Sequence, residues 1–146
     1  MRRKTARMKP SPAQVDAAKR LLAYEGGIGG GAEECAAAAG RVYEKLHLQL
    51  VPLVGSAGVR VLLARSAKLT QGEFPCLRDR AAVESSTKLR ACLQGQDPVA
   101  IAATAAALFG AFLTLITTLI GERLTMEVLR RTWPAVDPST PKETKR

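Results

Sequence analysis

The chain has 146 residues and a formal net charge of +9, and 47% of its residues are hydrophobic while only 4% are aromatic. This length suits one domain with its own core, and an apolar content dominated by Ala, Leu and Val favours helices over sheets. Three cysteines, one histidine and the lack of CxxC or HxxxH spacing exclude the common zinc motifs, so we expect neither a metal nor another cofactor.

The positive charge is concentrated at the N-terminus. Residues 1–9 contribute +5 of the net charge, residues 137–146 contribute +1, and all other residues together contribute only +3. We therefore expect residues 1–10 to form a basic disordered arm and residues 135–146 to form a polar tail. The alternative for the arm is contact with nucleic acid or with an anionic surface. Its basic residues are Arg2, Arg3, Lys4, Arg7 and Lys9.

Residues 11–134 are predicted to form a single helical domain that begins with a short helix. The stretch Ser11–Gln14 has the pattern of a capping box, with a proline in the first turn, and the helix is expected to end at Gly26. The glycine-rich run 26–31 lacks the GK[ST] ending of a phosphate loop, and two glutamates follow it. We interpret this run as a flexible joint, which would let the first helix dock separately or exchange with a neighbouring molecule.

Apolar residues at helical spacing predict further helices over 32–54 and 57–68, separated by glycines. A weaker helix is expected over 77–93, because Ser85 and its neighbours are poor helix formers. The only histidine, His47, lies one turn after Tyr43 on the edge of an apolar stripe. It is expected to be a structural polar group, bonded to the Tyr43 hydroxyl or to a core carbonyl.

The stretch Asp97–Trp133 is expected to form the long central helix. Asp97-Pro98 is an N-cap pattern. Residues 99–120 carry no charge, and a helix of this length can cross a bilayer of about 30 Å. However, the large apolar residues are concentrated in 108–120, and the helical pattern continues to Trp133. We therefore predict an all-α, four- to five-helix bundle around a long C-terminal apolar helix. A single membrane span over 98–121 is the alternative.

Small residues recur at every fourth position of this helix and predict a groove where another helix can approach closely. This α-helical groove is either a homodimer seam or a site of close packing within one chain. Its residues are Ala102, Ala106, Gly110, Thr114 and Thr118. Glu122 interrupts the apolar pattern further along and, with His47, is a candidate buried polar group, although a peripheral salt bridge is the simpler interpretation.

No nucleophile elbow, phosphate loop, paired-carboxylate motif or metal signature is present, so we expect no enzymatic activity. The leading hypothesis is a protein-interaction module that binds another protein or itself, with a homodimer as one form. Membrane association and nucleic-acid binding through the arm are the alternatives. The free thiols favour a reducing compartment, most simply the cytoplasm.

Overall fold

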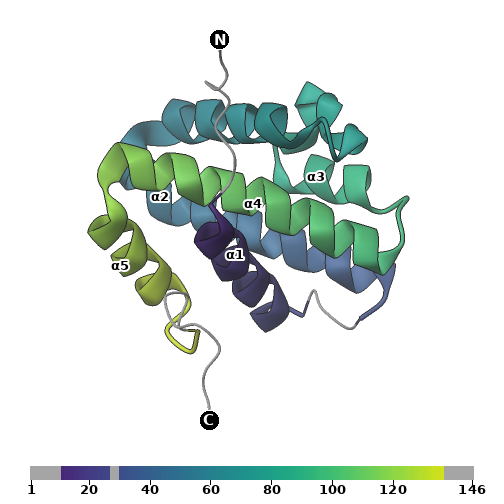
Figure 1. Cartoon of the computed structure of the whole chain (residues 1–146), viewed down its shortest axis with the longest axis horizontal. Coiled ribbons are helices and arrows are strands. Elements are labelled where there is room, and N and C mark those ends of the chain that lie inside the picture. Colours follow the sequence, from purple (N-terminus) through teal and green to yellow (C-terminus); the bar gives the residue numbers. More distant parts are fainter. Residues whose placement is uncertain (1–10, 27–29, 137–146) are drawn as a thin grey trace.

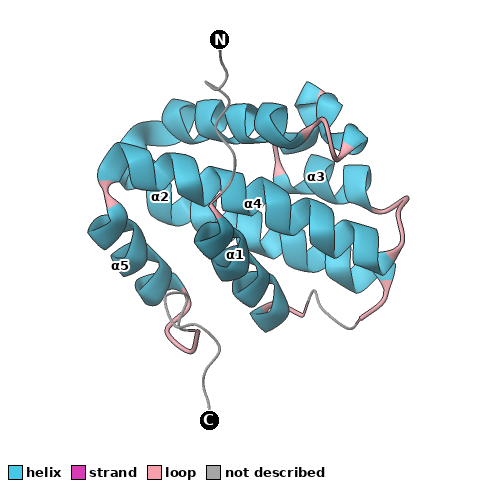
Figure 2. Ribbon diagram, in the orientation of Figure 1, coloured by secondary structure: helices cyan, strands magenta, loops and turns pink. Residues whose placement is uncertain are grey.

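The computed structural model describes residues 11–26 and 30–136, and within these it contains helices and no strands (Figures 1 and 2). The α-helices are α1 (Pro12–Tyr24), α2 (Ala32–Thr70), α3 (Ser86–Leu93), α4 (Pro98–Ile120) and α5 (Glu122–Thr132). Two short 3-10 helices, η1 (Pro75–Arg78) and η2 (Arg80–Val83), lie between α2 and α3. The predicted all-α bundle with a long apolar helix is confirmed.

Helix α4 is the centre of the bundle. It lies between α1 and α2, and its middle third is almost entirely buried (Figure 1). The predicted start is confirmed, because the Asp97 carboxylate accepts a hydrogen bond from the Ala100 amide at 2.9 Å and Pro98 is the first helical residue. Since its apolar side chains contact several helices, α4 joins the others into one core.

Helix α2 is bent in the middle, where the sequence predicts a break between two helices. Gly55 has φ 81° and ψ 156°, a conformation that favours glycine, and Pro52 supplies no amide hydrogen to the preceding turn. The chain nevertheless continues as helix on both sides of the bend. The two arms of α2 therefore point in different directions and carry different surfaces.

The prediction of one helix over 77–93 is wrong in its first half. Residues 75–83 form the two 3-10 turns, and only residues 86–93 are α-helical. The physical reason is Ser85, whose hydroxyl accepts a hydrogen bond from the Lys88 amide at 3.1 Å and so begins α3 as its N-cap. The small polar residues start a helix here instead of weakening one.

The prediction of one continuous helix to Trp133 is also wrong. Gly121, with φ 93° and ψ 154°, ends α4 and lets α5 turn back along the bundle (Figure 1). Leu119, at the corner, is 59% exposed, whereas Trp133 at the end of α5 is completely buried. The turn at Gly121 therefore brings the second half of the apolar pattern back onto the core.

Helices α2 and α4 both meet the length and composition of a membrane span. In α4, 67% of the most apolar window is buried against other parts of the chain, and in α2 only 22% is buried. Core helices of bundles meet the same criteria. Length and composition therefore do not distinguish a core helix of a bundle from the alternative, a membrane span over 98–121.

Candidate functional site

The small-residue groove of α4 is occupied by α1 of the same chain. A Cβ atom on Gly110 would lie 2.7 Å from Val15 Cγ2 and 2.9 Å from Val15 Cα, which is closer than side chains pack. Ala106 and Gly110 are buried, Ala102 and Thr114 are half-buried, and Thr118 is exposed. At Gly110, therefore, the groove packs closely against another helix of the same chain, which is one of its two predicted uses.

The N-terminal end of α1 is tied to α4 by hydrogen bonds. The Ser11 amide donates to Thr114 Oγ1 at 3.0 Å, and Gln14 Nε2 donates to Thr117 Oγ1 at 3.4 Å. The Thr114 hydroxyl itself donates to the Gly110 carbonyl at 2.8 Å, so it serves both helices. The predicted capping box is wrong, because Ser11 is the N-cap residue without a side-chain cap and the glutamine bonds to α4 instead.

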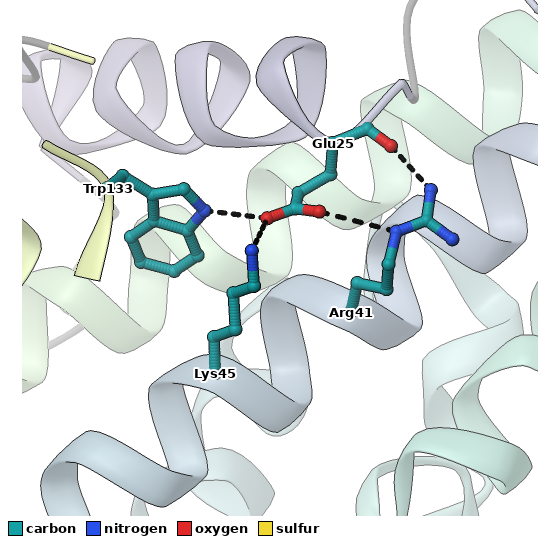
Figure 3. A network of polar contacts seen from close by, with 4 residues as sticks. All are labelled: Glu25, Arg41, Lys45 and Trp133. Atoms are coloured by element: carbon teal, nitrogen blue, oxygen red, sulfur yellow. Dashed lines mark hydrogen bonds and ion pairs between the residues drawn. The ribbon is translucent and has the colours of Figure 1, made fainter. Parts of the chain in front are cut away.

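The C-terminal end of α1 is held by the carboxylate of Glu25, as Figure 3 shows. Oε2 accepts from the indole Nε1 of Trp133 at 2.8 Å and from the ammonium of Lys45, and Oε1 accepts from Arg41 Nε at 3.3 Å. The Arg41 guanidinium also donates to the Glu25 backbone carbonyl. We call these four residues the Glu25 cluster. It joins α1, α2 and the end of α5 at one point.

The Glu25 side chain is only 6% exposed, whereas those of Arg41 and Lys45 are 48% and 41% exposed. Burial alone would raise the pKa of Glu25, but the hydrogen bonds from Lys45, Trp133 and Arg41, with the charge of Lys45, outweigh it. The pKa is therefore held below its ordinary value of 4.5. The carboxylate is ionised at neutral pH and accepts hydrogen bonds from all three of these side chains.

Aromatic rings surround the cation of this cluster. Lys45 Nζ lies 5.9 Å from the ring centroid of Tyr24 and 5.8 Å from that of Trp133, within the range of cation–π attraction. Tyr24 is 53% exposed and completes the last turn of α1. The two rings and the carboxylate together fix the position of this lysine side chain.

Glu25 is not among the residues predicted from the sequence, although the sequence carries a signal for it. A carboxylate at the C-terminal end of a helix faces the negative end of the helix dipole, so it needs a partner elsewhere in the fold. Arg41 and Lys45 are four residues apart and share one face of α2. Which distant residues meet there depends on the turn at Gly121, which the sequence pattern did not predict.

The predicted polar candidates lie away from this site. The Tyr43 hydroxyl donates to the Val83 carbonyl at 2.8 Å, while the His47 ring stacks on that of Tyr43, with centroids 6.2 Å apart. His47 is half-buried, and Glu122 is exposed in the first turn of α5, so the prediction that Glu122 is buried is wrong. The turn at Gly121 places Glu122 at the corner between α4 and α5, where it is exposed to solvent. The five basic residues of the N-terminal arm lie outside the described residues.

The cysteines carry no metal-site geometry. Within residues 11–26 and 30–136, no three His, Cys, Asp or Glu side chains gather closely enough to hold a metal ion. Cys92 Sγ donates to the Cys76 carbonyl at 3.2 Å, and Cys35 Sγ lies 3.8 Å from the Gly30 carbonyl oxygen, to which it donates. Burial, aided by the neighbouring Cys76, raises the pKa of Cys92 to about 12.

Comparison of this chain with protein-family models, with characterised proteins and with solved structures finds no match in any of the three.

Proposed function

We propose that this chain is a non-enzymatic helical interaction module that associates with a second copy of itself by exchanging α1. The observation that carries the proposal is the seat of α1 in the α4 groove, with Val15 against Gly110 and the Glu25 cluster at the far end. This binding site is specific for α1. The groove is complementary in shape to the middle of α1 at Gly110, and the Glu25 cluster is complementary in charge at the C-terminal end of α1. The partner helix that fits it best is the α1 of another molecule.

The connection between α1 and α2 supports exchange. The six residues 26–31, which follow Glu25, include five glycines and can span up to about 22 Å when extended. An exchanged α1 would make the same contacts in the second molecule that it makes in its own, so neither groove would be left empty. Exchange of an identical element is a route to dimers that requires no new complementary surface.

The Glu25 cluster provides a direct test through two charge-reversed variants, Glu25→Lys and Lys45→Glu. Within either variant alone, like charges meet at the end of α1. In a mixed dimer with exchanged helices, the native Glu25 meets the native Lys45 and the two new residues form a reversed pair. We expect the two variants, refolded together, to give a species with twice the 15.6 kDa mass of one chain. Light scattering after size-exclusion chromatography measures it.

A matched control replaces Glu25→Lys by Lys19→Glu, which changes the charge of α1 at an exposed position outside the cluster. Lys19→Glu refolded with Lys45→Glu is expected to give no mixed dimer. If Glu25→Lys and Lys45→Glu also remain two separate monomers at millimolar concentration, α1 does not exchange and the proposed function is rejected.

A further inference from the structure

A pocket of about 300 Å³ lies at the C-terminal end of α2, on the arm of that helix beyond the bend. The two 3-10 turns η1 and η2 close it on the side opposite α2. This volume is at the lower end of the range for small-molecule sites. The lining residues are Ala64, Arg65, Ala67, Lys68, Gln71, Leu77, Arg78 and Val83.

The lining combines cations with an apolar floor. Arg65, Lys68 and Arg78 are exposed, whereas Leu77 and Val83 are buried and belong to the hydrophobic core. Arg65 and Lys68 are three residues apart on α2 and share a face, and Arg78 ends η1 on the other side. Three positive charges therefore approach one apolar pocket from two elements.

Three acidic residues lie close to these cations in the chain, and none of them forms a salt bridge with a cation of the pocket: Glu73, Asp79 and Glu84. The Asp79 carboxylate accepts from the Ala81 amide at 3.0 Å as the N-cap of η2, and Glu84 pairs with Lys88 at 3.0 Å. No acid lines the pocket, and none of its three cations forms a salt bridge with another described residue. The positive potential is therefore open to a ligand from solution.

We propose that this basic pocket binds a small organic anion, a carboxylate or phosphate group carried on a compact apolar body. The anionic group would lie between Arg65 and Arg78, where guanidinium groups can bind two oxygens of a carboxylate or phosphate at once. The apolar body would lie against the exposed side chain of Ala64, with Leu77 and Val83 forming the floor beneath it. The half-buried amide of Gln71 supplies a further donor at the pocket wall.

The test titrates the full-length chain with phenyl phosphate and with benzoate, using isothermal calorimetry at low salt. Inorganic phosphate and phenol are the matched probes, because each has one half of the proposed ligand. We expect phenyl phosphate or benzoate to bind at least about tenfold more tightly than either half, and the affinity to fall as salt screens the cations. The two anions distinguish a phosphate ligand from a carboxylate ligand.

Two variants act on different parts of the pocket. Arg65→Gln combined with Arg78→Gln is expected to weaken binding by about tenfold or more, since hydrogen bonds to charged groups are lost. Ala64→Phe is expected to weaken it by filling the pocket, with all three cations retained. Arg60→Gln, an exposed change on α2 outside the pocket, is the control and should leave the affinity unchanged.

The proposal is overturned if neither anion binds at millimolar concentration, or if phenol or inorganic phosphate binds as tightly as the better-bound of the two anions. It is also overturned if the double variant binds as the unaltered chain does, or if only anionic lipid vesicles bind. None of these outcomes depends on exchange of α1, because the pocket lies on η1, η2 and α2 alone.

Discussion

Glu25 and Trp133 are 108 residues apart in the chain, and the indole N–H of Trp133 donates to the Glu25 carboxylate at 2.8 Å. Through this contact the end of α5 meets the end of α1, while Arg41 and Lys45 of α2 complete the set of donors. A buried carboxylate with this many partners is stable only while all three helices are in place. The stability of the bundle should therefore respond to changes at this one residue.

Replacing Glu25→Gln is expected to lower the free energy of unfolding by about 1.5–3 kcal/mol, the range for hydrogen bonds to charged groups. The amide keeps the shape of the side chain but loses the charge that holds Lys45 and Arg41. Urea denaturation followed by circular dichroism measures the change. Glu127→Gln, at an exposed position of α5, is the control and should change stability by less than about 0.5 kcal/mol. Equal stability of both variants would contradict the role given to the cluster.

Acidification should remove the contribution of the cluster. The pKa of Glu25 is below its ordinary value of 4.5 in the folded chain, so the folded state binds a proton less readily than the unfolded state does. The contribution is complete above about pH 4.5 and is lost as the pH falls through the lower folded value. The stability difference between the unaltered chain and Glu25→Gln should therefore shrink below that pH.

Fluorescence of the only tryptophan reports this change directly, since Trp133 is buried against the titrating group. We expect its emission in the folded state to stay constant above about pH 4.5 and to change below it. In Glu25→Gln the acid-dependent change should be absent. If the stability difference between the unaltered chain and Glu25→Gln stays constant as the pH falls below about 4.5, then the pKa of Glu25 in the folded chain has its ordinary value.

Alanine substitutions of two glycines should change the stability of the chain differently, although a new Cβ atom would be about equally crowded at both positions. On Gly110, a new Cβ would lie 2.9 Å from the Val15 Cα, whereas on Gly40 it would lie 2.8 Å from the Arg90 Cδ. The backbone of α1 cannot move away from Gly110 without losing its packing against α4. The exposed side chain of Arg90 can move away from Gly40. We expect Gly110→Ala to destabilise the chain by about 1–3 kcal/mol through overpacking.

Gly40→Ala, in contrast, should be neutral or stabilise by up to about 1 kcal/mol, because alanine is the better helix former. Thermal and urea denaturation of the two variants under the same conditions measure the contrast. If Gly40→Ala lowers stability as much as Gly110→Ala does, the close approach of the α1 backbone to Gly110 is not the cause of the loss.

The thiol of Cys92 should be unreactive in the folded chain. Burial, together with the neighbouring Cys76 side chain and the negative charge of Asp79, raises its pKa to about 12, so almost none of this thiol is ionised at pH 8. We expect slow alkylation by iodoacetamide, with a rate that rises about tenfold per pH unit up to pH 10. Mass spectrometry of the labelled peptide measures the rate, and the urea-unfolded chain is the control. Equally fast labelling in both states would contradict the raised pKa.

The sequence predicted the helical class, the N-cap at Asp97 and the change of direction near Gly55, because each depends on neighbouring residues. It also predicted the small-residue groove of α4, but not its occupant. Packing of Val15 against Gly110 is a contact between distant segments, and no local pattern distinguishes it from a contact between two chains. The spacing of apolar residues predicted that the last helix continues to Trp133, because a single glycine at position 121 does not interrupt that spacing. The corner at Gly121, and with it the site of Glu25, required the structure.

The large chain separation between Glu25 and Trp133 also orders events during synthesis at the ribosome. Of the five helices, α1 is made first, yet its C-terminal end lacks the hydrogen bond from Trp133 until α5 has been translated and has turned back at Gly121. Its groove on α4 is likewise absent until residue 120 has been added. Of the five helices, the one that is translated earliest is therefore among the last to make all of its contacts.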